Sequence, residues 1–351
     1  MHNQGIRRQT CAKRWYLLLS LLAFFCIAGH CGLCSAANDS HWEKTIPIVL
    51  TPDDNYAPHA GVAIISILEN SNPHYFYRFY VVHGKDLSKS NKDKLLSINQ
   101  AYPNCEILCI EGAPRADQLT MDTKHWGKTS TYRLFLPELQ ELSALDKLIY
   151  LDCDVTAVSD ISEFYDLPMD GKAILGMRSI KPTWHIQRLN RLSEKKKRLT
   201  NKRPGHKTPA ITNYMNSGVL LMDLGKLRKL HFPRQAVRWM NKYNPTFPDQ
   251  DTINILLYED IKIVEDLRWA YPAYPDESDK PNITATLPIV VYHYVGPFKP
   301  WSMPTPGNEA AIQALSEYHR YRMQSPWRYK PPLSPNTKSQ KRPEEAESTQ
   351  N

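Results

Sequence analysis

The sequence predicts an α/β fold in which a mostly parallel central sheet is flanked by helices. Short apolar runs alternate with amphipathic stretches over most of the chain, which is the pattern of strands that alternate with helices. Polar residues follow several of these runs directly, as expected where strands reach the ligand-binding edge of such a sheet. The chain of 351 residues, 42% of them hydrophobic, can bury one large core or one core with an appended subdomain.

In the first half of the chain, apolar runs bounded by turn residues predict strands, and apolar residues at helical spacing predict helices. The predicted strands cover residues 46–50, 75–83, 105–111 and 148–151. The predicted helices cover residues 61–68, 87–102 and 130–142.

The second half continues the alternation. Its predicted strands cover residues 172–178, 217–224, 261–265 and 288–295, and its predicted helices cover residues 232–243 and 249–259. The sequence has neither a Gly-x-Gly-x-x-Gly motif after its first strand nor a Walker motif. Dinucleotide-binding proteins and P-loop nucleotidases are therefore disfavoured.

Both ends of the chain lie outside the predicted domain, which covers residues 45–328. Residues 1–40 combine basic residues with an apolar run of about fifteen residues, "WYLLLSLLAFFCIAG". This length suits a signal peptide better than a membrane span, with a signal anchor as the alternative. We therefore expect a membrane-associated protein or one of the secretory pathway, and the cytoplasmic face of a membrane stays open. Residues 329–351 are rich in proline and charge, and we expect a disordered tail.

A basic insertion, residues 181–207, carries the positive charge of the chain. It holds ten Lys or Arg residues and one acidic residue, whereas the formal net charge of the whole chain is +8. A nucleic-acid-binding domain would spread its charge over a larger face, so we expect no nucleic-acid partner. The insertion is either a solvated helix with a thin apolar stripe (Ile186, Leu189 and Leu192) or a helix that rests on an anionic membrane surface or a phosphorylated glycolipid acceptor.

The seven cysteines do not form a disulfide framework. Four lie in or beside the N-terminal apolar run. Cys105 and Cys109 are four residues apart on one predicted strand, too far for a bridge, and Cys153 lies between two aspartates. We interpret these three as small buried thiols and expect neither a disulfide nor a zinc site.

The stretch "KLIYLDCDV" is a predicted buried strand that ends in two aspartates one residue apart. Because side chains alternate along a strand, Asp152 and Asp154 point to the same side and repel one another unless a cation lies between them. A hard divalent ion with oxygen ligands would satisfy both carboxylates. Aspartates at strand ends also cap turns and helices, so the pattern alone leaves both readings open.

Further polar residues follow the last predicted strand, in "YHYVGPFKPW". This stretch supplies His293 and Lys299, and a lone histidine here would be read as a loop residue. Two carboxylates, an imidazole and an ammonium at one edge of a sheet match what a metal-diphosphate needs. The carboxylates and the imidazole hold the ion, and the lysine neutralises phosphate charge.

Six short motifs follow one another along the chain: "IVLTPDDNYA", "TYRL", "YLDCDV", "MNSGVLLMDL", "FPDQDTIN" and "HYVGPFKPW". In this order they resemble the retaining glycosyltransferases of family 8, which include bacterial lipopolysaccharide galactosyl- and glucosyltransferases and glycogenin. The resemblance runs from about residue 46 to residue 301, and its last motif is the most specific. It implies a GT-A-type nucleotide-sugar-binding fold, a UDP-sugar donor, and Mn²⁺ or Mg²⁺ as the metal.

The resemblance also implies roles for single residues. The implied metal ligands are Asp152, Asp154 and His293. The implied UDP-sugar-binding residues are Thr51, Asp53, Asn55, Tyr56, Arg133, Asp152, Cys153, Asn216, Gly296 and Lys299. The implied catalytic residues are Asp249, Gln250 and Lys299. Because glutamine is a poor nucleophile, Gln250 favours attack by the acceptor on the front face of the donor within an ion pair.

One departure from the family concerns the acceptor side, where relatives carry an acidic residue after the strand "AILGM" and this chain has "RSIKPTWH". The resemblance implies a metal-dependent retaining hexosyltransferase. It would move galactose or glucose from a UDP-sugar to a glycan or glycolipid acceptor such as lipopolysaccharide core. The alternative is a catalytically silent nucleotide-sugar- or glycan-binding module of the same fold.

Overall fold

The computed structural model describes residues 41–121, 127–180, 182–199, 211–273, 288–296, 299–302 and 309–328. The described residues divide into two compact units, one of residues 41–45 with 73–76 and the other of the remaining described residues. In the first unit the amide of Glu43 donates to the carbonyl of His74 at 3.0 Å. The predicted targeting segment, residues 1–40, and the predicted tail, residues 329–351, lie outside the described residues.

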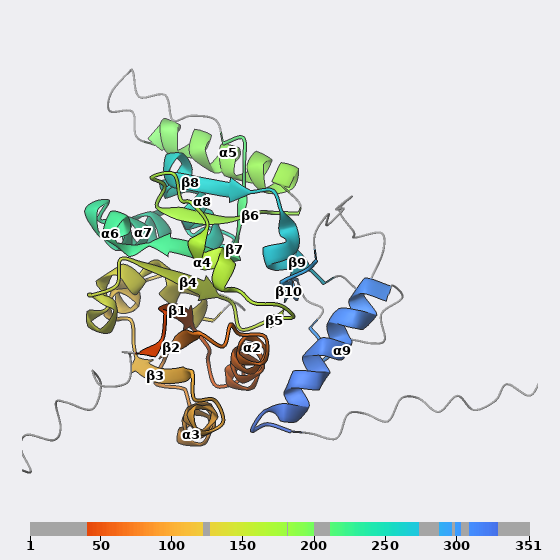
Figure 1. The fold of residues 1–351 in the computed structure, drawn as a ribbon. Coiled ribbons are helices and arrows are strands. Elements are labelled where there is room, and N and C mark those ends of the chain that lie inside the picture. Colours follow the sequence, from red (N-terminus) through yellow and green to blue (C-terminus); the bar gives the residue numbers. More distant parts are fainter. Residues whose placement is uncertain are drawn as a thin grey trace, which may run out of the picture. The chain divides into compact units, whose positions relative to one another are not determined.

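The main sheet has the strand order β3-β2-β1-β4-β7-β6-β8 within the described residues (Figure 1). The strands are β1 (Lys44–Leu50), β2 (Tyr75–His83), β3 (Cys105–Glu111), β4 (Lys147–Leu151), β6 (Ile174–Arg178), β7 (Met215–Asp223) and β8 (Ile261–Val264). The pairs β1–β4, β2–β3 and β6–β8 are parallel, whereas β7 is antiparallel to both of its neighbours. The predicted fold class, a mostly parallel sheet flanked by helices, is confirmed.

Helices cover the sheet and bury its apolar strands. They are α2 (Ala57–Glu69), α3 (Lys89–Ser97), α4 (Ser162–Asp166), α5 (Pro182–Leu199), α6 (Leu224–Lys229), α7 (Phe232–Tyr243), α8 (Pro248–Leu256) and α9 (Glu309–Gln324). Figure 1 shows α9 beside α2, against which it packs. A large core cluster joins strands β4 and β7 to α7 and includes Tyr150, Leu220 and Met240.

The antiparallel direction of β7 determines where the site lies. Leu151, the last residue of β4, pairs with Val219 in the middle of β7, so the first half of β7 extends past the end of β4. The next hydrogen bond runs from the amide of Asp152 to the carbonyl of Gly218 at 2.7 Å. The end of β4 and the beginning of β7 therefore meet at one edge of the sheet.

A second, three-stranded sheet brings the C-terminal part of the chain to the same edge. It consists of β5 (Val155–Ala157), β10 (Val291–His293) and β9 (Tyr271–Pro272), with β10 in the middle. His293 pairs with Val155, and the amide of Tyr294 donates to the carbonyl of Asp154 at 3.0 Å. The sequence did not predict β5 or β9, because runs of two or three residues carry no periodicity.

Four helix assignments differ from the prediction within the described residues. The predicted helix over residues 130–142 is wrong, since this stretch forms three successive 3₁₀ turns, with Pro137 in the second. Proline cannot donate within a helix, and the apolar residues here are buried at every turn instead of on one face. Helices α4, α6 and α9 were not predicted, although in α9 Ala311, Ala314, Tyr318 and Tyr321 are buried at helical spacing.

The basic insertion begins with α5, so its predicted helix is confirmed, while residues 200–207 lie outside the described residues. Leu189 is fully buried with Ile211 and Tyr214, and Ile186 packs against this cluster. Ile186 and Leu189 of the apolar stripe therefore rest on the protein itself, and Leu189 is not available to a membrane surface.

The predicted membrane or secretory localisation is corrected. Across the part of the chain that the structure describes, no helix is both long and apolar enough to cross a bilayer. The apolar run on which the prediction rested belongs to residues 1–40.

Replacing Leu189 with alanine should destabilise the protein, because the side chain is fully buried in the contact between α5 and the domain. We expect the free energy of unfolding to fall by about 2–5 kcal/mol, as for other buried leucines. Urea denaturation followed by circular dichroism would measure it, with Arg191→Ala on the exposed side of α5 as the control. Equal stability of both variants would contradict this packing of α5.

Candidate functional site

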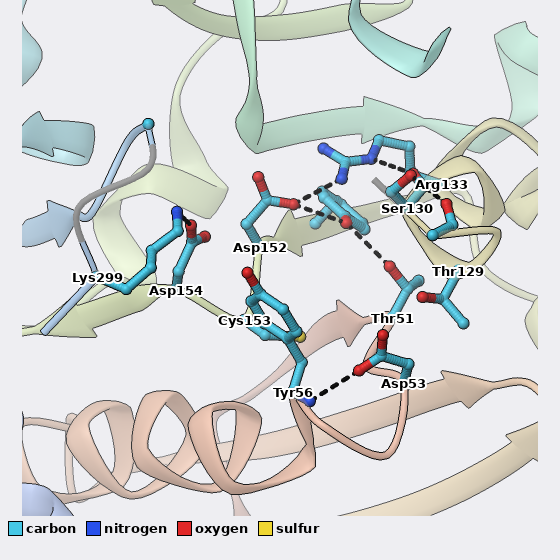
Figure 2. Close-up of a pocket in the computed structure, with 13 residues that line it drawn as sticks. Thr51, Asp53, Tyr56, Thr129, Ser130, Arg133, Asp152, Cys153, Asp154 and Lys299 are labelled. Atoms are coloured by element: carbon cyan, nitrogen blue, oxygen red, sulfur yellow. Dashed lines mark hydrogen bonds and ion pairs between the residues drawn. The ribbon is translucent and has the colours of Figure 1, made fainter. Parts of the chain in front are cut away.

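Asp152 and Asp154 follow β4 directly, as the sequence predicts, and Figure 2 shows both carboxylates at one cavity. Asp152 Oδ1 accepts hydrogen bonds from Arg133 Nη2 at 2.7 Å and from the Tyr150 hydroxyl at 3.0 Å. The Tyr150 hydroxyl is in turn 3.0 Å from the hydroxyl oxygen of Thr51. Although burial raises the pKa of Asp152, the adjacent Arg133 guanidinium holds it below its usual value.

His293 completes a group of three potential metal ligands. Its Nε2 lies 3.6 Å from Asp152 Oδ2 and 3.5 Å from Asp154 Oδ1. One ligand atom from each of the three residues lies within 4.8 Å of the others. Burial lowers the pKa of His293, but the two carboxylates outweigh it and raise this pKa to about 9. Two carboxylates and an imidazole are the donor set of a divalent cation, so these residues fit the metal that the sequence predicts.

The close approach of these residues depends on Gly218. A Cβ atom at this position would lie 2.2 Å from His293 Cε1 and 2.7 Å from Asp152 Oδ2. Only glycine at the beginning of β7 leaves space for the imidazole beside the carboxylate.

Lys299 supplies positive charge from the loop after β10. Its ammonium pairs with Asp154 Oδ2 and donates to the carbonyl of Tyr294 at 2.6 Å. Burial raises the pKa of Asp154, but Lys299 and His293 together bring it well below its usual value. Lys299 and Arg133 thus lie on opposite sides of the two carboxylates, where Lys299 pairs with Asp154 and Arg133 pairs with Asp152 (Figure 2).

The cavity has a volume of about 450 Å³ and is lined by four separate segments of chain. The lining residues are Thr51, Asp53, Tyr56, Gly127, Thr129, Ser130, Arg133, Tyr150, Asp152, Cys153, Asp154, Gly296 and Lys299. Sequence reasoning missed Gly127, Thr129, Ser130 and Tyr150. The position of Thr129 and Ser130 just before the motif "TYRL" was the available signal.

Most of the predicted donor-binding residues line this cavity, but two do not. Asn55 is exposed in the turn after β1 and does not reach it. Asp53 shapes that turn, since its Oδ1 accepts a hydrogen bond from the amide of Tyr56 at 2.8 Å. Asn216 also lies outside the lining.

The predicted residues Asn216, Asp249 and Gln250 lie behind Arg133. Asp249 Oδ2 is 3.2 Å from Arg133 Nη1 and accepts from the Ser217 hydroxyl at 2.8 Å. Gln250 Oε1 accepts from Asn216 Nδ2 at 3.3 Å and from the amide of Ser217 at 3.1 Å. Burial raises the pKa of Asp249. These three residues support the arginine and the beginning of β7.

Trp301 fixes the C-terminal motif to α2 and α9. Its ring stacks on His59 of α2, with centroids 3.4 Å apart and planes at 14°. His59 Nδ1 is 2.6 Å from the Tyr318 hydroxyl on α9. The loop that carries Lys299 is therefore anchored by aromatic contacts outside the cavity.

The structure also adds an acidic residue where the sequence showed none. Arg178, the last residue of β6, pairs with Glu265 next to the end of β8, with Nε and Oε2 2.9 Å apart. Because β6 and β8 are parallel neighbours, Glu265 lies next to Arg178 although it is 87 positions away in the sequence. It is therefore beside the stretch "RSIKPTWH", where the chain departs from the family pattern.

This fold and this site are those of a glycosyltransferase with the GT-A fold. Residues 47–304 match the family model Glycosyl transferase family 8, and the chain belongs to this family. General stress protein A of Bacillus subtilis is 24% identical over 75% of this chain and 90% of the relative. The lipopolysaccharide 1,2-glucosyltransferase of Escherichia coli K12 is 27% identical over 79% of this chain and 77% of its own.

Solved structures agree on the fold. The galactosyltransferase LgtC, in complex with donor and acceptor sugar analogues, is matched with a TM-score of 0.60 and 21% identity over 80% of this chain and 96% of LgtC. The bifunctional glycosyltransferase WbbM gives a TM-score of 0.62 and 21% identity, over 82% of this chain and about half, 51%, of WbbM.

Replacing Gly218 with alanine should weaken binding of a divalent cation, because the added methyl group displaces His293 or Asp152. We expect the affinity for Mn²⁺ to fall about 10- to 100-fold, the scale seen when the groups that orient metal ligands are changed. Isothermal titration calorimetry would measure it. Gly225→Ala is the matched control, since a Cβ there lies 3.4 Å or more from its neighbours. Unchanged affinity in Gly218→Ala would exclude this arrangement of ligands.

Proposed function

We propose that the protein is a metal-dependent retaining hexosyltransferase that moves galactose or glucose from a UDP-sugar to a glycan or glycolipid acceptor. The observation that carries this proposal is the group of Asp152, Asp154 and the buried His293, whose two aspartates line the cavity of a family 8 chain. Two aspartates and a lysine on one cavity, with an imidazole against both carboxylates, suit a nucleoside diphosphate with its metal.

The cavity supports distinct roles for its residues. Asp152, Asp154 and His293 hold Mn²⁺ or Mg²⁺, which when bound stabilises the charge of a departing diphosphate. Thr51, Asp53, Tyr56 and Cys153, which line the cavity, bind the nucleoside, and Gly296 and Lys299 bind the diphosphate. Asn55 is the residue whose donor contact the cavity supports least, because it is exposed.

Retention of configuration follows two possible routes, and the side chains near the donor favour one of them. A covalent route needs a free nucleophile. The Asp249 carboxylate is engaged by Arg133 and Ser217, and Gln250 is an amide whose oxygen already accepts from Ser217. In front-face attack, the acceptor oxygen bonds to the anomeric carbon on the side that the diphosphate leaves. The acceptor proton passes to the leaving diphosphate oxygen.

The acceptor is the less constrained partner. Matched relatives are named lipopolysaccharide 1,2-glucosyltransferase and lipopolysaccharide 1,3-galactosyltransferase, which supports an oligosaccharide of the lipopolysaccharide core as a candidate. A catalytically silent binding module remains the alternative function. The presence of Arg133, both aspartates, His293 and Lys299 on one site disfavours it.

The proposal is tested by incubating the protein with Mn²⁺ and single UDP-sugars and measuring released UDP. Release from UDP-galactose or UDP-glucose that EDTA abolishes is expected. NMR of the product formed with a core oligosaccharide would then give the linkage and the anomeric configuration. No UDP release with any UDP-hexose, with or without acceptor, would contradict the proposed function.

Replacing Asp154 with asparagine should abolish Mn²⁺-dependent turnover, because an amide is a poor ligand for a hard cation. The metal-free protein should unfold at a lower temperature, because Lys299 and His293 lose the carboxylate that balances their charge, and the rise in Tm that Mn²⁺ gives the native protein should disappear. Asp117→Asn, an exposed aspartate paired with Lys128, is the matched control. Full activity of Asp154→Asn would remove the metal from the reaction.

Lys299→Ala should lower kcat more than it raises the KM for the donor, because the leaving diphosphate gains charge as the glycosidic bond breaks. We expect kcat to fall about 100-fold or more, the scale of a lost electrostatic contact in a transition state. Steady-state kinetics with varied donor would separate the two constants. If only KM rises, Lys299 serves to bind the donor.

A further inference from the structure

A buried line of polar contacts joins the basic helix α5 to Gln250, and it begins at Asp251. Asp251 is 0% exposed. Arg188 of α5 meets both of its carboxylate oxygens, with Nη1 2.6 Å from Oδ2 and Nη2 against Oδ1. The Tyr214 hydroxyl donates to Oδ1 at 2.7 Å, and the amide of Phe247 donates to Oδ2 at 3.0 Å.

The chemistry of these groups fixes the direction of every hydrogen bond that follows. A carboxylate paired with a guanidinium only accepts, so the Tyr214 hydroxyl must donate its proton to Asp251. The same hydroxyl can then only accept from Gln250, whose Nε2 lies 3.1 Å away. The Gln250 amide therefore turns its nitrogen to Tyr214 and its oxygen to the Ser217 amide, 3.1 Å away.

The line ends at the cavity. The carbonyl of Ser217 accepts from Arg133 Nη1 at 2.6 Å, and the next carbonyl, of Gly218, accepts from the amide of Asp152 at 2.7 Å. The orientation of Gln250 is thus tied both to Arg188 and to the residues that hold Arg133 and Asp152 in place.

Arg188 is well placed for such a role because its guanidinium is shielded from solvent. Its carbon Cζ lies 4.9 Å from the centre of the Phe247 ring and 5.3 Å from that of Trp184. Aromatic faces on a cation and a bidentate partner restrict the guanidinium to one orientation. A lysine at this position would keep the charge and lose the two parallel hydrogen bonds.

We infer that Arg188 is a positioning residue for the transfer reaction, which sets the amide of Gln250 through Asp251 and Tyr214. The inference rests on the proposed function, in which Gln250 lies next to the donor sugar. The inference gives the basic insertion a role within the enzyme. Helix α5 follows β6, next to the expected acceptor site, and the contacts through Asp251 and Tyr214 connect it to Gln250 on the donor side. The competing interpretation is that Arg188 and Asp251 only hold α5 on the domain.

The variant that separates the two interpretations is Tyr214→Phe. It keeps the ring that stacks on His185 and leaves the pair of Arg188 and Asp251 intact, but removes the acceptor of the Gln250 amide. We expect kcat to fall about 10- to 100-fold, with the KM for the donor within about threefold, as for a small misplacement of reacting groups. The kcat of Arg188→Lys should lie between that of Tyr214→Phe and that of the native protein. The matched control is Arg191→Met, because Arg191 is exposed on the same helix.

Native kcat in folded Tyr214→Phe or in folded Arg188→Lys would overturn the inference and leave a purely structural ion pair. A second readout needs no activity. In a ¹H–¹⁵N spectrum, the side-chain amide signals of Gln250, assigned by their absence in Gln250→Glu, should shift in Tyr214→Phe and stay unchanged in Arg191→Met. Unchanged signals in Tyr214→Phe would also overturn the inference. If the native protein releases no UDP from any UDP-hexose, the proposed function fails, and the spectra still decide whether Gln250 is coupled to Tyr214.

Discussion

Two partly buried carboxylates at the end of β4 are the constraint on which the site depends. Buried charges need compensating charge and hydrogen bonds, and Asp152 and Asp154 receive them from three distant segments. Arg133 comes from the 3₁₀ turns before β4, His293 from the small second sheet, and Lys299 from the loop after it. Each of these segments is separated from β4 in the sequence, and the fold brings it to the two carboxylates. The charge balance therefore depends on the fold, and the ion pairs in turn stabilise the fold.

The antiparallel strand β7 makes this balance possible. In a wholly parallel sheet the beginning of a neighbouring strand would lie at the opposite edge, away from the ends of β1 and β4. Here the beginning of β7 lies beside Asp152, and Gly218 leaves room for His293. Ser217 then links Arg133 to Asp249 and Gln250. One reversed strand therefore supplies both the space for a cation and the support behind it.

The basic helix α5 lies where the chain departs from the family pattern, and it contacts the motif "FPDQDTIN", which conforms to that pattern. Leu189 packs on the domain, and Arg188 enters the same interface to pair with Asp251. Arg188 of the insertion is thus held in a contact within the protein. This placement explains how an insertion that no family motif accounts for is compatible with an intact site.

The sequence by itself determined the fold class, the positions of most strands, and several of the residues that meet at the site. Alternating apolar runs give the sheet, and the motifs identify Asp152, Asp154, His293, Arg133 and Lys299. These features are local, because each depends on residues a few positions apart. Tertiary structure decided the rest, because it depends on register and burial between distant segments. It turned residues 130–142 into 3₁₀ turns, left Asn55 exposed, and placed Tyr150 and Ser130 on the cavity. It also buried Leu189 and paired Arg188 with Asp251, because α5 and α8 are far apart in the sequence and meet only in the folded chain.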